Sequence, residues 1–168
     1  MDVWRVPVIA HPLLEGLWEL LAQAPRPRGF LRYGDLEADW AEGPGVEDRP
    51  TPRTRHMGEF SGRMDSALGL GFPTLRRRAF GCYPAGGGLG WHTNSDTPGW
   101  RVYLVRSGGG QLLLPGSAVD DRDAHANIFR VGMGTWHAVR AVGDRYVLGF
   151  VPDNDFRDDL LEVAAKVA

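Results

Sequence analysis

Residues 127–151 read NIFRVGMGTWHAVRAVGDRYVLGFV, and this stretch decides the fold. It contains three short runs rich in Val, Ala, Leu and aromatic residues, at 127–131, 137–141 and 145–151, which are separated by glycine-containing links. Runs of this length between turn residues predict β-strands. The Gly143-Asp144 pair predicts a hairpin between the last two strands.

The same texture extends upstream and predicts more strands, at residues 75–83, 89–94, 101–106 and 111–114. Before them, residues 11–24 carry leucines at three- and four-residue spacing, which predicts an amphipathic helix. Residues 155–167 predict a C-terminal helix with Asp155 as its N-cap. Many short strands with helices outside them predict a mainly β jelly-roll sandwich with flanking helices.

The chain of 168 residues is expected to be a single domain. Residues 1–74 would form a helical and loop-rich covering region, with a long arm at 26–55 and a second short helix at 57–68. Residues 75–151 would form the β core, and residues 152–168 the C-terminal helix.

Composition excludes several functional classes. The single cysteine, Cys82, excludes an intramolecular disulfide framework. The net charge of -2 argues against generic nucleic-acid binding. No apolar run is long enough to span a membrane, and the N-terminus lacks a signal-peptide pattern, so we expect a cytoplasmic protein without a membrane partner.

Two histidines on predicted strands could hold a metal. His92 and Asn94 are two residues apart and would share one face of a strand, and His137 begins a later strand. Two imidazoles and one oxygen ligand on a β scaffold are typical of a non-haem iron site, although packed structural histidines give the same triplet. Trp91 and Trp136 precede the two histidines and would point to the opposite face, where a covering helix could bury them.

Arg145 is the second candidate for chemistry. Strand alternation places Arg145, Val147 and Gly149 on one face of the last strand. Arginine suits bidentate recognition of a carboxylate, so a small diacid could be its partner. A structural salt bridge to Asp144 or Asp153 is the competing interpretation.

The motifs become more specific in combination. In chain order they are Tyr83, WHTNSD at 91–96, PGWRVYL at 98–104, FRVG at 129–132, WHAV at 136–139 and GDR at 143–145. This arrangement resembles the iron(II)/2-oxoglutarate-dependent oxygenases, in particular the compact members found in bacteriophage genomes. The resemblance covers roughly residues 75–151.

The resemblance implies a double-stranded β-helix, a cupin-like relative of the jelly roll, and a metal site for Fe(II). His92 and His137 would be ligands. Asn94 stands where the family usually has a carboxylate, and its neutral amide oxygen is a weaker donor to a hard cation. Asp96 is the alternative third ligand.

The resemblance also implies a co-substrate site. Arg145 would pair with the distal carboxylate of 2-oxoglutarate. Tyr83 or Tyr103 would hydrogen-bond the same carboxylate, and Arg101 would line the pocket.

The implied activity is an O2-dependent oxidation of 2-oxoglutarate coupled to hydroxylation of a second substrate, in the cytoplasm of a bacterium or a phage-infected host cell. That substrate could be a modified nucleobase, a protein side chain or a metabolite. The first alternative is a jelly-roll binding module that kept the pocket but lost the redox chemistry. A weaker alternative is a sugar-binding or isomerase cupin.

Overall fold

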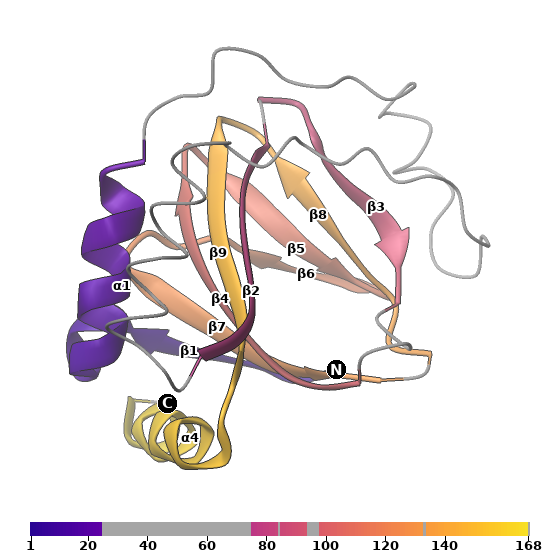
Figure 1. Cartoon of the computed structure of the whole chain (residues 1–168). Helices are drawn as coiled ribbons and strands as arrows, with labels where there is room; N and C mark the ends of the chain where they lie inside the picture. Colours follow the sequence, from indigo (N-terminus) through magenta and orange to yellow (C-terminus); the bar gives the residue numbers. More distant parts are fainter. Residues whose placement is uncertain (25–74, 84, 94–97, 133, 168) are drawn as a thin grey trace.

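The computed structural model describes residues 1–24, 75–83, 85–93, 98–132 and 134–167. Within these residues the strands form two antiparallel sheets (Figure 1). Sheet A has the order β1-β7-β4-β9-β2, and sheet B has the order β3-β8-β5-β6. The strand bounds are β1 Val3–Pro7, β2 Leu75–Tyr83, β3 Gly88–His92, β4 Gly99–Ser107, β5 Gly110–Leu114, β6 Ser117–Asp120, β7 His125–Val131, β8 His137–Ala141 and β9 Arg145–Pro152.

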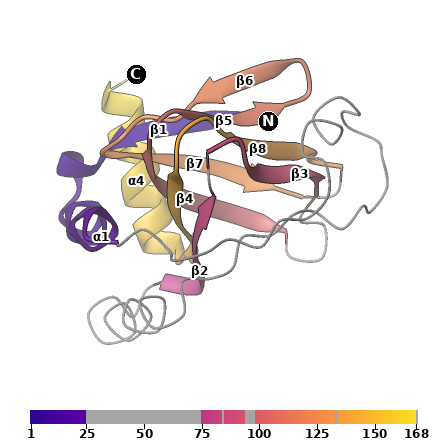
Figure 2. The same cartoon turned by 90° about the horizontal axis from the view of Figure 1, so that it is seen from above.

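The two long helices of the described chain lie on the outer side of sheet A, as Figures 1 and 2 show. They are α1, Pro12–Ala22, which follows the short 3-10 turn η1, Val8–Ala10, and α4, Asn154–Val167. Their apolar side chains are buried together with residues of β4, β7 and β9; the buried helical residues are Leu14, Leu17, Leu21, Phe156, Leu160 and Ala164. Apolar stripes at helical spacing therefore bury against one face of the sheet.

A second apolar cluster lies between the sheets. It joins Phe129 and Val131 of sheet A to Leu112, Leu114 and Val139 of sheet B. Packing of two antiparallel sheets face to face defines a jelly-roll sandwich, so the predicted fold class is confirmed. Sheet A is thus covered by helices on one face and by sheet B on the other.

Alternation along β9 follows the prediction. Tyr146, Leu148 and Phe150 join the cluster under the helices. Arg145 and Val147 face the interior between the sheets. Each face of this strand meets a different core, which explains why nearly all of its residues are apolar.

The predicted hairpin at Gly143-Asp144 is wrong. Strand β8 belongs to sheet B and β9 to sheet A, so the two do not pair. The link instead lies against the β4–β5 link: Val142 N–H donates to the Gly109 carbonyl at 2.9 Å, and a Cβ at Gly143 would lie 2.7 Å from the Gly108 carbonyl oxygen. The link carries the chain from sheet B to sheet A, and its packing partner is a segment distant in the sequence.

Two strands and one cap were not predicted. Strand β1 pairs with β7 at the edge of sheet A, and β6 pairs with β5 at the edge of sheet B. Strand β6 is short and mostly exposed, so it lacks the apolar pattern of a core strand. Asp153, rather than Asp155, caps α4, because its carboxylate accepts a hydrogen bond of 2.9 Å from the Phe156 N–H.

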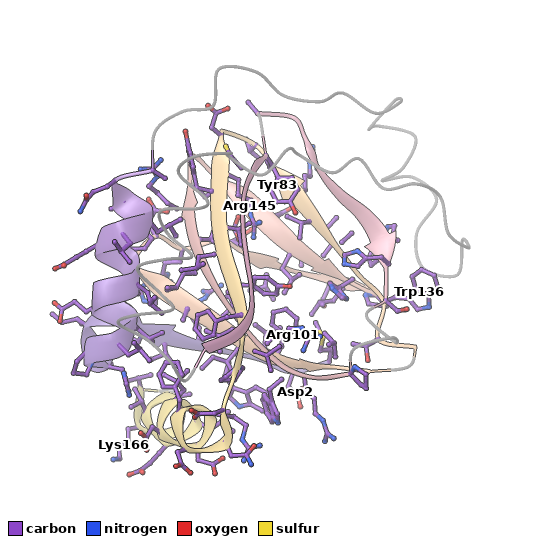
Figure 3. The ribbon with its side chains drawn as sticks, viewed as in Figure 1. Asp2, Tyr83, Arg101, Trp136, Arg145 and Lys166 are labelled. Atoms are coloured by element: carbon purple, nitrogen blue, oxygen red, sulfur yellow. The ribbon has the colours of Figure 1, made fainter. Side chains whose placement is uncertain are left out.

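The predicted arm at 26–55 and helix at 57–68 lie outside the described residues. The expected helical cover over Trp91 and Trp136 does not come from α1 or α4, which pack on sheet A. Figure 3 shows Trp136 at the outer edge of the molecule, away from both helices. No helix in the described part of the chain is long and apolar enough to cross a membrane.

Candidate metal and ligand site

A cavity of about 50 Å³, partly open to solvent, lies between the two sheets. Both sheets contribute to its wall, and its lining combines apolar and polar side chains. The lining residues are Tyr83, His92, Tyr103, Leu112, Asn127, Phe129, His137, Val139, Arg145 and Val147. The cavity therefore brings together five of the residues that the sequence singled out, namely Tyr83, His92, Tyr103, His137 and Arg145.

His92 and His137 are direct neighbours across the β3–β8 ladder. Their ring centroids are 4.2 Å apart, and the ring planes are inclined by 55°. Nδ1 of His92 is 2.8 Å from the Gly90 carbonyl oxygen, and Nδ1 of His137 is 3.1 Å from the Thr135 carbonyl oxygen. A carbonyl can only accept, so in each ring Nδ1 carries the hydrogen, and the neutral form of either ring has its lone pair on Nε2.

This arrangement suits metal ligation. Backbone carbonyls that hold Nδ1–H fix the orientation of an imidazole and prepare Nε2 as a donor. Burial, together with the charges of His92 and Arg101, lowers the pKa of His137 to about 4, and the hydrogen bond to the Thr135 carbonyl opposes this shift only in part. His137 is consequently neutral at pH 7, which is the form that binds a metal.

Arg145 forms an ion pair with Asp121, not with Asp144 or Asp153. Its Nε donates to Asp121 Oδ2 at 2.7 Å and its Nη2 donates to Oδ1 at 3.2 Å. The side chains of Arg145 and Asp121 are 4% and 0% exposed. A guanidinium has five N–H donors, so three donors of this cavity-lining group have no hydrogen bond with a described residue.

The Asp121 carboxylate is held against the backbone of β5. A Cβ at Gly110 would collide with Asp121 Oδ2, and the Asp121 N–H donates to the Gly110 carbonyl at 2.9 Å. Glycine at position 110 therefore lets the carboxylate approach closely enough to reach Arg145.

The two tyrosines occupy different places in the cavity. Tyr83 is the cross-strand partner of Arg145, whose guanidinium carbon lies 5.8 Å from the ring centroid (Figure 3). Tyr103 stacks on Phe129, with a centroid distance of 5.3 Å. Burial raises the pKa of Tyr103 despite the opposing charges of Arg101 and Arg145, so its hydroxyl stays protonated and can donate a hydrogen bond at neutral pH.

Arg101 does not belong to the cavity wall. It is buried, and its Nη1 donates to the Trp100 carbonyl at 3.0 Å. Its charge nevertheless acts on both Tyr103 and His137. Arg101 shares the face of β4 that carries Tyr103, and its contact with a ligand stays a prediction.

The third ligand stays a prediction. Asn94 and Asp96 lie outside the described residues. Within the described part of the chain, no group of three or more His, Cys, Asp or Glu side chains could hold a metal ion. The described structure therefore supplies two imidazole donors.

Asn127 is a cavity residue that sequence reasoning missed. It is 4% exposed and lines the cavity. A signal was present, because strand alternation places Asn127 on the same face of β7 as the buried residues Phe129 and Val131. Asp121 was also missed, since it lies in a short link outside every periodic run.

Comparisons with known proteins leave the family open. No family model and no curated protein matches the chain. Similar solved structures include a predicted oxalate decarboxylase from Thermotoga maritima, with 16% identity over 51% of this chain and 73% of that chain and a TM-score of 0.37. Two others are a cupin-2 domain protein from Shewanella frigidimarina (19% identity, 45% and 70% of the chains, TM-score 0.34) and a Cupin 2 conserved barrel domain protein from Salinispora arenicola (12%, 51% and 69%, TM-score 0.34). Likenesses this distant do not indicate what the chain does.

Proposed function

We propose that this protein is an iron(II)- and 2-oxoglutarate-dependent oxygenase that hydroxylates a modified nucleobase, a protein side chain or a metabolite. The observation that carries the proposal is the histidine pair. His92 and His137 face each other across two strands, each with Nδ1 on a backbone carbonyl, in a cavity that Arg145 also lines.

The donor set fits a divalent metal. Two imidazoles in adjacent strands can offer Nε2 to one ion, and iron is among the metals that imidazole suits. Asn94 or Asp96 would complete the site. When bound, iron(II) supplies the O2-dependent oxidation that amino-acid side chains cannot perform alone.

The remaining residues bind, orient and exclude water. Arg145 offers three N–H donors to a carboxylate of the co-substrate while Asp121 holds its other edge. The Tyr103 hydroxyl, kept protonated by burial, offers a further donor. Leu112, Val139 and Val147 provide apolar walls that limit water around the bound acid.

A second candidate function is a metal-independent binding module. The observation that favours it is the Asp121–Arg145 ion pair, because Asp121 already neutralises the charge that would attract a diacid. Asn94 in place of a carboxylate favours it as well, since the first shell of the metal would then be neutral.

Anaerobic calorimetry distinguishes the two functions. Mn(II), which does not react with the co-substrate under these conditions, and 2-oxoglutarate are titrated separately and together. The oxygenase predicts metal binding and a 2-oxoglutarate affinity that rises at least tenfold with metal. The His137→Ala variant should lose both effects, and the His125→Ala variant, whose imidazole lies outside the cavity wall, should keep them. Metal-independent binding of 2-oxoglutarate would favour the binding module, and no binding of either species by the folded protein would overturn the oxygenase proposal.

A further inference from the structure

Asp121 occupies one edge of the Arg145 guanidinium and leaves the other edge to the cavity. The two carboxylate oxygens of Asp121 accept hydrogen bonds from Nε and Nη2 of Arg145 at 2.7 and 3.2 Å. This pairing uses one of the edges on which a guanidinium can bind an acid group. Arg145 lines the cavity and Asp121 does not, so a ligand in the cavity meets the edge formed by Nη1 and the second N–H of Nη2.

The two charges are shielded from water together. The side chains of Arg145 and Asp121 are 4% and 0% exposed, and the Asp121 N–H donates to the Gly110 carbonyl at 2.9 Å, which fixes the backbone of Asp121. Solvent therefore screens both charges only weakly. A carboxylate on the remaining edge of the guanidinium would be attracted by Arg145 and repelled by Asp121 from the opposite edge, so much of the attraction cancels.

A second acidic residue lies near the pair but is not buried. Ser107 is the cross-strand partner of Arg145, and its N–H donates to Asp123 Oδ1 at 2.7 Å. Asp123 is exposed, so water screens its charge far more than that of Asp121. Asp121 is thus the carboxylate with the stronger effect on a bound anion, and Asp123 offers a matched control.

We infer that Asp121 is a specificity-determining residue: by neutralising Arg145, it makes this part of the cavity select hydrogen-bond acceptors rather than negative charge. The inference rests on the proposed function, in which Arg145 binds a carboxylate of 2-oxoglutarate. It adds a class of ligand, because 2-oxo acids with an uncharged carbonyl group in place of the distal carboxylate should bind about as well. Arg145 donates N–H groups to either one, and the charge of the carboxylate adds little beside Asp121.

The 5-amide of 2-oxoglutarate is the probe, because an uncharged group of nearly the same shape replaces its distal carboxylate. Calorimetry with Mn(II) bound and O2 excluded compares the two acids. In the wild-type protein their affinities should differ by less than about tenfold. Asp121→Asn removes the charge and keeps the shape, so 2-oxoglutarate should bind about tenfold more tightly or better, while the amide changes little. Asp123→Asn, the same change at the exposed neighbour, should alter neither affinity.

The ratio of the two affinities separates a specificity role from a structural one. Loss of a merely structural partner would affect both acids alike, and a ratio unchanged in Asp121→Asn would overturn the inference while leaving the proposed function intact. The wild-type comparison does not depend on the folding of a variant, and a preference of more than about tenfold for 2-oxoglutarate would also overturn the inference. A wild-type protein that binds neither acid would overturn the proposed function, and the inference with it.

Discussion

Arg145 and Asp121 are joined by two hydrogen bonds, of 2.7 and 3.2 Å, in an ion pair that solvent scarcely reaches. Asp121 lies behind the cavity wall and Arg145 lies in it. The pair therefore gives Arg145 two roles, one in holding the link between β6 and β7 to β9 and one in offering its remaining donors to a ligand. A test of ligand binding by Arg145 must therefore separate it from the contribution of the ion pair to stability.

Removal of one partner of the ion pair should destabilise the protein more than removal of both. Asp121→Ala leaves a buried guanidinium without its counter-charge and should lower the free energy of unfolding by about 3–5 kcal/mol. The double variant Asp121→Leu with Arg145→Met should recover much of this loss. Urea denaturation measures both values, and a double variant less stable than Asp121→Ala would contradict this account of the pair.

The same double variant tests the ligand role of Arg145. A stable protein without the guanidinium should bind 2-oxoglutarate at least tenfold more weakly in the presence of Mn(II), while Mn(II) itself still binds, because the metal ligands are unchanged. Calorimetry provides both affinities. Undiminished 2-oxoglutarate affinity would show that Arg145 is only a structural partner of Asp121.

Gly149 sets the position of the Tyr103 ring. An added Cβ at Gly149 would lie 2.6 Å from Tyr103 Cδ1 and closer still to Cε1. Gly149→Ala should therefore displace the ring into the cavity and lower the free energy of unfolding by about 1–3 kcal/mol. Tyr103→Leu should relieve most of that loss in the double variant, as urea denaturation would show. Equal losses in the two backgrounds would mean that the methyl group does not meet Tyr103.

Burial of neutral His137 makes stability depend on pH. Its pKa is about 4 in the folded protein and 6.5 ordinarily, so between these values the unfolded chain binds more protons. Stability from this group is full above pH 6.5 and declines as the pH falls toward 4, by about 3 kcal/mol at most. His137→Asn should flatten this part of the pH profile of unfolding free energy. Parallel profiles for the two proteins would contradict the low pKa.

Asn94 should weaken metal binding by leaving the first shell neutral. Asn94→Asp is expected to tighten Mn(II) binding about tenfold, which corresponds to ~1.4 kcal/mol. Asp96→Ala is the companion variant in the same titration. If Asp96→Ala abolishes binding while Asn94→Asp changes nothing, the third ligand is Asp96.

Strand alternation allowed much of the fold to be predicted from sequence. The pattern on β9 separates its inner and outer faces correctly, and His92 and His137 line one cavity as expected. The predictions that were wrong depend on contacts between segments that are distant in the sequence. The Gly143-Asp144 turn packs on the β4–β5 link, and the partner of Arg145 comes from a link 24 residues earlier rather than from a nearby aspartate.

Asn127 escaped prediction for a different reason. Alternation with Phe129 and Val131 places Asn127 on an inner face, but its burial in a cavity wall is visible only in the folded chain. The two histidines, by contrast, stand out in the sequence. Asn94 follows His92 by two residues, and a tryptophan directly precedes each histidine.

X-ray absorption at the metal edge tests the central claim most directly, because it reports which side chains hold the ion. The protein loaded anaerobically with Fe(II) should show scattering from two imidazole rings, and His92→Ala and His137→Ala should each remove one of them. Spectra that are identical in the wild-type protein and both variants would contradict the claim that His92 and His137 form a metal site.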